Sequence, residues 1–274
     1  MEHKIYGPKI GLELKVISMN KVAILYVCTG KYIVFWDLFY KSYEEYFLPN
    51  SEKEYFVFTD ADSSFAANLK NVHVIYQKQQ PWPYPTLLRY HMFQKISNQL
   101  KEFDYTFFMN SNCQCVATVS EEEFLPKKGL LVVSHPGFFD KTNDEFTYDR
   151  NEKSTAYIPY GTGEVYVCGG VNGGRSEAFA ELIDTIVTNV DRDNDNHIIA
   201  KWHDESHINR YIVGRNDYTL LSPSYCYPEG WDLPFDCKIL IREKSKWIDV
   251  TRVKRSFMSK VIAHIQKWLC WLKK

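Results

Sequence analysis

The stretch KVAILYVCTGKY, residues Lys21 to Tyr32, is a continuous apolar run that ends in Thr-Gly. Its composition and length are those of a buried strand, and Gly30 supplies a turn residue. Apolar and aromatic residues follow at helical spacing: Phe35, Leu38, Phe39, Tyr43, Tyr46 and Phe47. The stretch therefore predicts a strand, a turn and a helix in succession.

The next segments repeat this alternation. Glu54–Asp60 and Asn71–Lys78 are aromatic and β-branched runs that predict two strands. After the Pro-rich QQPWPYP, Leu88, Met92 and Ile96 recur every four residues and predict a helix. Alternating strands and helices are typical of an α/β domain with an open nucleotide-binding sheet. The chain has 274 residues, 45% of them hydrophobic, which suffices for one such domain.

The second half of the chain has a different texture. TAYIPYGTGEVYVCGGVNGG is rich in Gly and Tyr, and we assign no element to it. A helix is predicted from roughly Ser176 to Val190, and another begins at Asp204. No internal repeat or flexible linker separates two domains.

Polar residues follow three of the apolar runs. Thr29-Gly30 and Asp60 do so, and in YTFFMNSNCQC (Tyr105 to Cys115) a buried run leads directly into Asn110-Ser111-Asn112. Ligands of open α/β sheets bind outside the carboxyl ends of the strands. We therefore expect these residues to meet at a ligand site.

The chemistry of Asn-x-Asn differs from that of the Asp-x-Asp with which many nucleotide-sugar transferases hold a divalent cation. At about 4 Å and an effective dielectric near 20, a unit charge is worth roughly 4 kcal/mol, so two amides attract a cation far less. They do not repel phosphate and can donate hydrogen bonds to it. Alternatively, the two asparagines simply form a turn.

Other candidate metal sites are weak. Seven cysteines are scattered without a framework of spacings, which favours a reducing compartment, and we interpret Cys113 and Cys115 as packing residues. His203 and His207 stand four residues apart, but Glu205 is displaced from its place in HExxH. No signal-peptide core or long apolar span occurs, so we expect the protein to stay in the cytoplasm.

Seven motifs in order carry a resemblance to a known family: HPGFF, EFTYDR, STAYIP, VYVCGGVNGG, WHDESHINRY, LSPSY and ILIREK. Together they resemble glycosyltransferase family 6, over about Val22 to Lys246. That family includes the histo-blood-group A and B transferases, α-1,3-galactosyltransferase and bacterial relatives. The resemblance implies a single GT-A domain and a retaining transfer of galactose or N-acetylgalactosamine from UDP to the 3-hydroxyl of an acceptor galactose.

The resemblance also implies where the donor binds. The Asn-Ser-Asn triplet looks like that of metal-independent bacterial members, so no metal and no cofactor are expected, and cations of the protein should neutralise the departing UDP. The implied donor-binding residues are Val27, Cys28, Thr29, Tyr32, Trp82, Arg89, Asn110, Ser111, Asn112, Cys168, Gly169, Gly170, Asp204, Arg242 and Lys244. Tyr32 and Trp82 could equally be core residues, and Lys244 a solvated strand end.

Specificity and catalysis follow from the same resemblance. Gly169 and Gly170 leave room beside C2 of the sugar, which favours N-acetylgalactosamine, with galactose as the alternative. Glu205 is the implied catalytic carboxylate, either a covalent nucleophile or a charge that stabilises an oxocarbenium-like state. Alternatively, Glu205 has no catalytic role and is an ordinary acid at a helix start, where it complements the helix dipole. The implied acceptor residues are His135, Phe138, Thr147, Trp202 and Glu229.

The end of the chain is basic. Seven Lys and Arg and no acid follow Asp249, which leaves residues 1–250 at −8, with 26 Lys and Arg against 34 acids. We predict an extension of unknown role (1–20), the transferase domain (21–250) and a basic amphipathic helix (251–274). Residues 255–274 suit peripheral contact with an anionic membrane at the inner face of the cytoplasmic membrane. Docking on the protein itself is the alternative.

The expected partners are a UDP-sugar and a galactose-terminated oligosaccharide or glycolipid, with no nucleic acid. A function of another class also fits: a nucleotide-sugar or glycan-binding protein that has lost catalysis together with its metal site. Retention of Glu205 and both cationic candidates argues against that loss.

Overall fold

The fold was examined in a computed structural model that describes residues 19–249. The predictions for residues 1–18 and for the basic C-terminal helix lie outside the described residues. The first half of the described chain contains β1 (Lys21–Val27), α1 (Trp36–Tyr46), β2 (Glu52–Thr59), β3 (Val72–Tyr76), α2 (Tyr84–Leu87), α3 (Arg89–Gln94), α4 (Ser97–Leu100), β4 (Tyr105–Met109), β5 (Cys113–Cys115) and α5 (Glu121–Phe124).

The second half contains β6 (Leu130–Ser134), β7 (Val167–Arg175), α6 (Ser176–Asp195), α7 (Asp204–Ile212), β8 (Tyr218–Leu221), β9 (Tyr227–Pro228) and β10 (Ile239–Ile241). Four short 3-10 helices join them: η1 (Gly30–Phe35), η2 (Ser63–Ala66), η3 (Pro223–Tyr225) and η4 (Lys244–Lys246). None of the helices within residues 19–249 is both long and apolar enough to cross a membrane.

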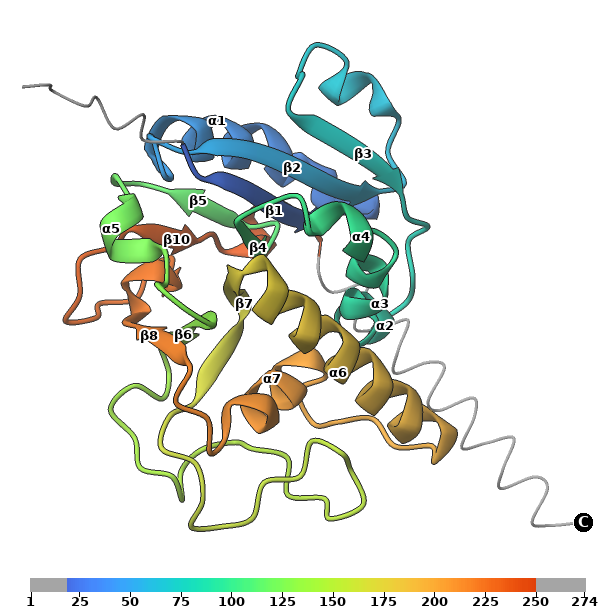
Figure 1. Cartoon of the computed structure of the whole chain (residues 1–274), viewed down its shortest axis with the longest axis vertical. Helices are drawn as coiled ribbons and strands as arrows, with labels where there is room; N and C mark the ends of the chain where they lie inside the picture. The colour runs from blue at the N-terminus through green and yellow to red at the C-terminus, as the bar shows by residue number, and fades with distance from the viewer. Residues whose placement is uncertain (1–18, 250–274) are drawn as a thin grey trace, which may run out of the picture.

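The main sheet has seven strands in the order β3-β2-β1-β4-β7-β6-β8. The four strands β3, β2, β1 and β4 run parallel, and β7 lies antiparallel between β4 and β6. A second sheet, in the order β5-β10-β9, joins the C-terminal part of the described chain to the segment that follows β4 (Figure 1). The predicted α/β class with a GT-A-like single domain is confirmed.

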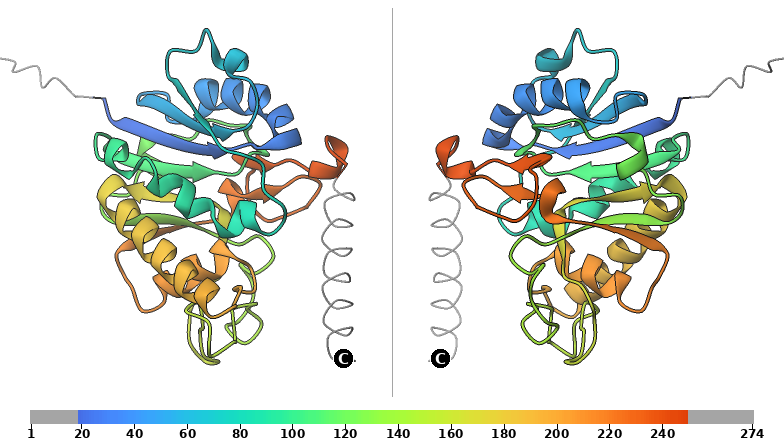
Figure 2. Two further views of the ribbon diagram at one scale, coloured as in Figure 1. Left: turned by 90° about the vertical axis from the view of Figure 1, so that its right-hand side faces the viewer. Right: turned by 90° about the vertical axis from the view of Figure 1, so that its left-hand side faces the viewer.

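Strand β1 is buried on both faces because it is a continuous apolar run whose successive side chains point to opposite faces of the sheet. Val22, Ile24 and Tyr26 enter one core cluster, and Ala23 and Leu25 enter the other. Helices α3, α6 and α7 cover the second face, while α1 covers the first (Figures 1 and 2).

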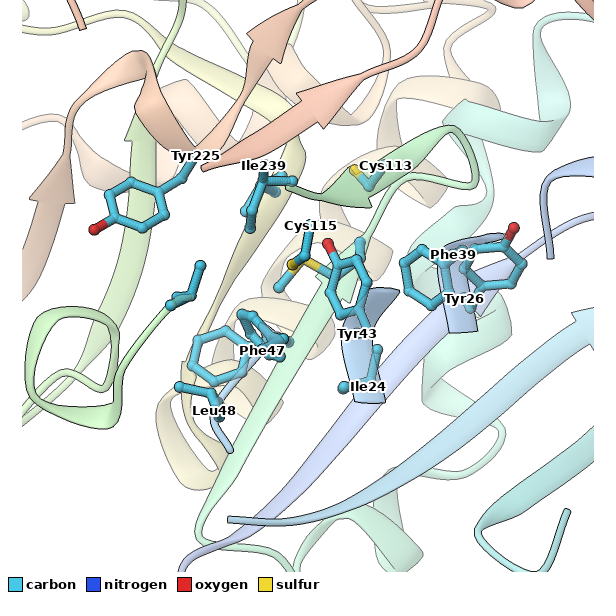
Figure 3. Close-up of a cluster of buried hydrophobic side chains, with 14 of the residues drawn as sticks. Ile24, Tyr26, Phe39, Tyr43, Phe47, Leu48, Cys113, Cys115, Tyr225 and Ile239 are labelled. Atoms are coloured by element: carbon cyan, nitrogen blue, oxygen red, sulfur yellow. The ribbon is translucent and has the colours of Figure 1, made fainter. Parts of the chain in front are cut away.

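The core under α1 is largely aromatic. Phe39 and Tyr43 of α1, with Phe47 directly after the helix, lie over β1, and the two cysteines of β5 pack beside them (Figure 3). Cys113 and Cys115 are each 1% exposed, so the interpretation that they are packing residues is confirmed. The six cysteines of the described chain are free thiols.

Two predictions about elements need correction. The helix predicted around Leu88, Met92 and Ile96 is three short helices, because Leu88 and Ile96 leave helical geometry with ψ of 18° and 12°. The Gly- and Tyr-rich stretch to which no element was assigned contains β7, a central strand. There Gly173 lets β4 approach closely, since a Cβ on it would lie 2.3 Å from Phe107 Cδ1.

Candidate active site

Three adjoining cavities lie around the exposed indole of Trp82, beyond the carboxyl ends of the parallel strands. We name each by one lining residue: the Thr29 cavity (about 120 Å³), the Glu205 cavity (about 180 Å³) and the Trp231 cavity (about 460 Å³). Trp82 borders all three, and Tyr32 borders two of them. Trp82 is 42% exposed and is not a core residue, whereas Tyr32 is half-buried and packs against the core cluster under α1.

Asp60 ties together the loops that follow β1 and β3. Its Oδ1 accepts a hydrogen bond from the Gly30 backbone N–H at 2.6 Å, and its Oδ2 accepts one from Gln79 N–H at 3.2 Å. Gly30 has φ of +59°, and a Cβ there would lie 2.6 Å from the Gln79 side chain. Asp60 thus supports the turn at Gly30 but borders none of the three cavities, whereas Thr29 and Asn110 meet at the Thr29 cavity. The positive φ favours a glycine at this turn.

Of the four predicted donor-binding residues in and around the loop after β1, three line a cavity and one is buried in the core. Val27, Thr29 and Tyr32 line the Thr29 cavity. Cys28 is fully buried in the core, so any contact that it makes with a donor must come from its backbone. Burial also raises the pKa of the Cys28 thiol to about 12, which keeps it neutral.

The Asn-Ser-Asn turn joins the large sheet to the small one. Asn110 borders the Thr29 and Glu205 cavities, and Ser111 borders the former. Asn112 is 2% exposed; its Nδ2 donates to the Arg242 carbonyl at 2.7 Å, and its carbonyl accepts from Arg242 N–H. Asn110 is therefore free to meet a ligand. Asn112 fixes the segment that follows β10 through its Nδ2, but it also borders the Trp231 cavity, and its buried Oδ1 has no hydrogen-bond partner among the described residues.

That segment carries the two predicted cations. Lys244 lines both the Thr29 and Trp231 cavities, with Nζ 5.3 Å from the centre of the Tyr32 ring. Arg242 lines the Trp231 cavity and stacks on Trp247 at 3.8 Å. Its two terminal nitrogens are buried without a hydrogen-bond partner in the described chain. Burial, aided by nearby Arg89, lowers the pKa of Lys244.

Glu205 lies in the first turn of α7 and faces its own cavity. Its Oε2 accepts a hydrogen bond from Gly169 N–H at 2.8 Å, and its Oε1 accepts one from the Tyr166 hydroxyl at 2.9 Å. Burial raises the pKa of Glu205 to about 7, although both hydrogen bonds oppose the rise. A carboxylate held at both oxygens beside a polar cavity is suited to stabilise positive charge.

Asp204 and Arg89 form a buried ion pair beside Glu205. Arg89 donates from one nitrogen to Asp204 Oδ2 at 2.6 Å and to the Gly169 carbonyl at 3.3 Å. The Asn172 amide donates to the same carbonyl at 3.0 Å. Burial raises the pKa of Asp204 to about 6, with Arg89 opposing the shift. The pair therefore helps to fix the backbone at Gly169, whose N–H holds Glu205.

The segment predicted to read the donor sugar is only partly exposed to the cavity. Gly169 and Gly170 line the Glu205 cavity, but the Cys168 side chain is 4% exposed in the core. A Cβ on Gly169 would lie 3.1 Å from Glu205 Cβ, whereas one on Gly170 would lie 3.5 Å from Asn110 Nδ2. A methyl group would thus fit at Gly170 at ordinary contact distance, while at Gly169 it would crowd Glu205.

Two of the predicted acceptor residues, His135 and Phe138, pack around Tyr166. Their ring centres lie 5.6 and 4.6 Å from that of Tyr166. Nearby Thr147 opposes the rise that burial causes in the pKa of Tyr166. Gly137 N–H donates to His135 Nδ1, and burial lowers the pKa of His135 to about 4. His135 is thus neutral, with its proton on Nε2.

Trp202 borders the Glu205 cavity, and Glu229 borders the Trp231 cavity. The Glu229 carboxylate pairs with Lys246 at 2.7 Å and accepts from Glu243 N–H at 2.6 Å. Among the described residues, the Glu229 carboxylate therefore contacts the segment that contains Arg242 rather than Tyr166.

Comparison with known proteins decides the family. The model of glycosyltransferase family 6 matches residues 14–262. The chain belongs to glycosyltransferase family 6. The matched range is longer at both ends than the resemblance expected from sequence, Val22 to Lys246. It includes residues 251–262 of the predicted C-terminal helix, which lie beyond the end of that resemblance.

Individual relatives agree with this family membership. The chain is 36% identical over 225 residues to the O-antigen biosynthesis glycosyltransferase WbnI of Escherichia coli, covering 82% of this chain and 95% of that protein. It is 32% identical to histo-blood group ABO system transferase 1 of Rattus norvegicus (73% and 60%). It is 27% identical to globoside α-1,3-N-acetylgalactosaminyltransferase 1 of Gallus gallus (82% and 66%). The chain thus spans about two thirds or less of these animal relatives.

Family membership implies a nucleotide-sugar donor and a glycan acceptor, and it supports hexosyl transfer. In this family 6 member, His203 and His207 do not share a helix face. His203 precedes α7 with φ of +55° and meets Trp82 edge-on at 4.8 Å, whereas His207 is 2% exposed. The weak HExxH-like pattern therefore describes no paired ligands.

Sequence reasoning missed several residues that line the site. Gln79, Gln80 and Thr86 border the Thr29 cavity, and Tyr166 holds Glu205. Tyr166 stands inside the quoted motif VYVCGGVNGG, but nothing local marks its hydroxyl, because its partner is 39 residues away.

Proposed function

We propose that this chain is a retaining transferase that moves N-acetylgalactosamine from UDP to the 3-hydroxyl of a galactose, fucosylated or not, in α linkage. The observation that supports this most is Glu205, whose carboxyl group is held at both oxygens on the wall of the Glu205 cavity. The acceptor would be a cell-surface glycan such as a lipopolysaccharide precursor, by analogy with the O-antigen relative.

In this reaction the bond from the sugar's anomeric carbon to UDP breaks, and its electron pair leaves with the phosphate. The bond to the acceptor O3 forms, and the hydroxyl proton passes to the departing phosphate or to water. Ionised Glu205 either forms a covalent intermediate or stabilises the oxocarbenium-like state while the acceptor attacks from the face that UDP leaves. Both roles require an anionic Glu205.

We further propose that no metal ion takes part. Neutral amides replace the carboxylates that would attract a divalent cation. Lys244 stands where the Thr29 and Trp231 cavities meet, so a diphosphate lying across that boundary would find a fixed cation. Arg242 adds a second positive charge to the same segment.

Two alternatives remain, one for the donor and one for the class of function. Galactose could replace N-acetylgalactosamine as the transferred sugar, since the argument from glycine now depends on Gly170 alone. The chain could instead bind nucleotide-sugars or glycans without catalysis. The ordered contacts of Glu205 favour an enzyme over this rival.

One assay separates these functions. UDP-GalNAc and UDP-Gal are each offered with lactose and with fucosylated lactose, and the product linkage is determined by NMR. We expect α-1,3 product, faster with UDP-GalNAc. Faster transfer from UDP-Gal would support the galactosyltransferase alternative, and UDP binding without turnover of any pair would support the binding protein.

We place the enzyme in the cytoplasm, with residues 255–274 in peripheral contact with anionic lipid at the inner face of the cytoplasmic membrane. The proposal depends on the basic, acid-free composition of those residues.

A further inference from the structure

The two oxygens of Glu205 are held by groups of different kinds. The Gly169 N–H that binds Oε2 belongs to the backbone of β7. The hydroxyl that binds Oε1 belongs to a side chain, Tyr166, to which neither the sequence motifs nor the comparisons assign a role. Tyr166 is therefore the contact that a substitution can remove cleanly.

The Tyr166 ring is rigidly placed. It is 2% exposed and stacks on Tyr148 with ring centres 5.4 Å apart, and Phe138 packs on it at 4.6 Å. Its carbonyl accepts a hydrogen bond from His135 N–H at 2.8 Å. A buried ring packed on several sides cannot rotate away, so its hydroxyl has one position.

The next residue along β7 is joined directly to α7. The Asn209 side chain accepts from Val167 N–H at 2.9 Å and donates to the Val167 carbonyl at 2.9 Å. It also donates to the Glu205 carbonyl at 2.9 Å. The backbone next to Tyr166 and the backbone of Glu205 are thus held in one register, and the hydroxyl contact is fixed from both sides.

We propose that Tyr166 is a positioning residue that holds the Glu205 carboxylate in one orientation and in its anionic form. It also joins Glu205 to the predicted acceptor residues His135 and Phe138, whose rings pack on it. The inference rests on the proposed function, because it gives Glu205 its catalytic task. Tyr166 acts through Glu205, whose Oε1 accepts its hydrogen bond.

The ionisation of both groups agrees with this role. Burial raises the pKa of Tyr166 far above its ordinary value, so the hydroxyl remains a donor at every working pH. A hydrogen-bond donor to a carboxylate favours its charged form. The pKa of Glu205 is already raised to about 7. Loss of the hydroxyl should therefore leave much of Glu205 protonated at pH 7.

The test compares Tyr166→Phe with Tyr55→Phe. Tyr55 is a matched control: its buried hydroxyl also donates to a glutamate, Glu44, at 2.7 Å, but it lies under α1, away from the three cavities. For each protein we measure kcat against pH with UDP-GalNAc and lactose, the Kd of UDP, and the Tm.

For Tyr166→Phe we expect the acid limb of the profile to move about one to two pH units upward, with the Kd of UDP unchanged. Tyr55→Phe should keep the wild-type limb. A Tyr166→Phe enzyme with the wild-type limb would overturn the proposal, even if kcat fell. Should Tyr166→Phe fail to fold, 3-fluorotyrosine in place of Tyr166 decides: its hydroxyl is a stronger donor to Glu205 and should move the limb downward, and an unchanged limb overturns the proposal.

A second readout does not need turnover. The carboxyl carbon of Glu205 is titrated by ¹³C NMR in labelled protein, assigned with Glu205→Gln. A higher pKa in Tyr166→Phe than in the wild type supports the proposal, and equal values overturn it. If the wild type turned over no donor, that result would count against the proposed function alone, because this titration would still decide the role of Tyr166.

Discussion

At the scale of single residues, Glu205 determines how the enzyme should respond to pH. Its pKa is raised above the ordinary carboxyl value to about 7, mainly by burial, so the anion forms only as pH rises through neutrality. We expect kcat at pH 6 to be roughly one-tenth of its plateau above pH 8. Initial rates with saturating substrates between pH 5 and 9 provide the measurement, and a flat profile would contradict this role.

The two glycines of the Glu205 cavity should respond differently to the same substitution. Gly169→Ala places a methyl group 3.1 Å from Glu205 Cβ and should lower kcat about tenfold with both donors, because the carboxylate is displaced. Gly170→Ala meets Asn110 at ordinary contact distance and should lower kcat/KM for UDP-GalNAc about tenfold relative to UDP-Gal. Equal loss with both donors in Gly170→Ala would remove Gly170 from donor selection.

The contacts of single residues also show where sequence reasoning stops. Arg89 and Asp204 were both expected at the donor, and they do border the Glu205 cavity. Their ion pair joins residues 115 positions apart, and such a contact leaves no periodic signal in the chain. The buried side chains of Cys28 and Cys168 were unpredictable for the same reason, because each is covered by neighbours from distant segments.

At the scale of elements, the segment after β10 connects the Asn-Ser-Asn turn to the predicted phosphate site. Lys244→Ala should weaken UDP binding about 30-fold, because a hydrogen bond to a charged group contributes about 2 kcal/mol to the free energy of binding. Lys31→Ala removes the same charge from an exposed position on η1 and should leave the Kd of UDP unchanged. Isothermal titration measures both. Equal affinities of Lys244→Ala and the wild type would exclude Lys244 from the phosphate site.

Elements were predictable from sequence where the pattern is local. Strand β1, the turn at Gly30 and helix α1 follow from a continuous apolar run and a helical repeat. Strand β7 was missed because glycine is a poor strand former. Gly173 and Gly174 are required by the neighbouring backbone, since a Cβ on Gly173 would lie 2.3 Å from the Thr106 carbonyl oxygen and one on Gly174 would lie 2.4 Å from the Gly129 carbonyl oxygen. The four-residue repeat after Pro85 likewise contains no signal for the breaks at Leu88 and Ile96.

At the scale of the whole molecule, the charge of the chain is divided between an acidic body and a basic end. Deleting residues from Arg255 onward should release the enzyme from anionic vesicles and spare its activity on soluble acceptors. Co-sedimentation with phosphatidylglycerol vesicles, compared with phosphatidylcholine vesicles, gives the measurement. A truncated chain that no longer folds, judged by its Tm, would contradict the lipid anchor and indicate a helix packed on the protein.

The whole account depends on charges of the protein replacing a metal ion at the diphosphate. The most direct test is the rate of transfer from UDP-GalNAc to lactose after exhaustive treatment with EDTA, with and without added Mn²⁺. We predict equal rates in both conditions, because Lys244 and Arg242 supply the positive charge. A rate abolished by EDTA and restored by Mn²⁺ would contradict it.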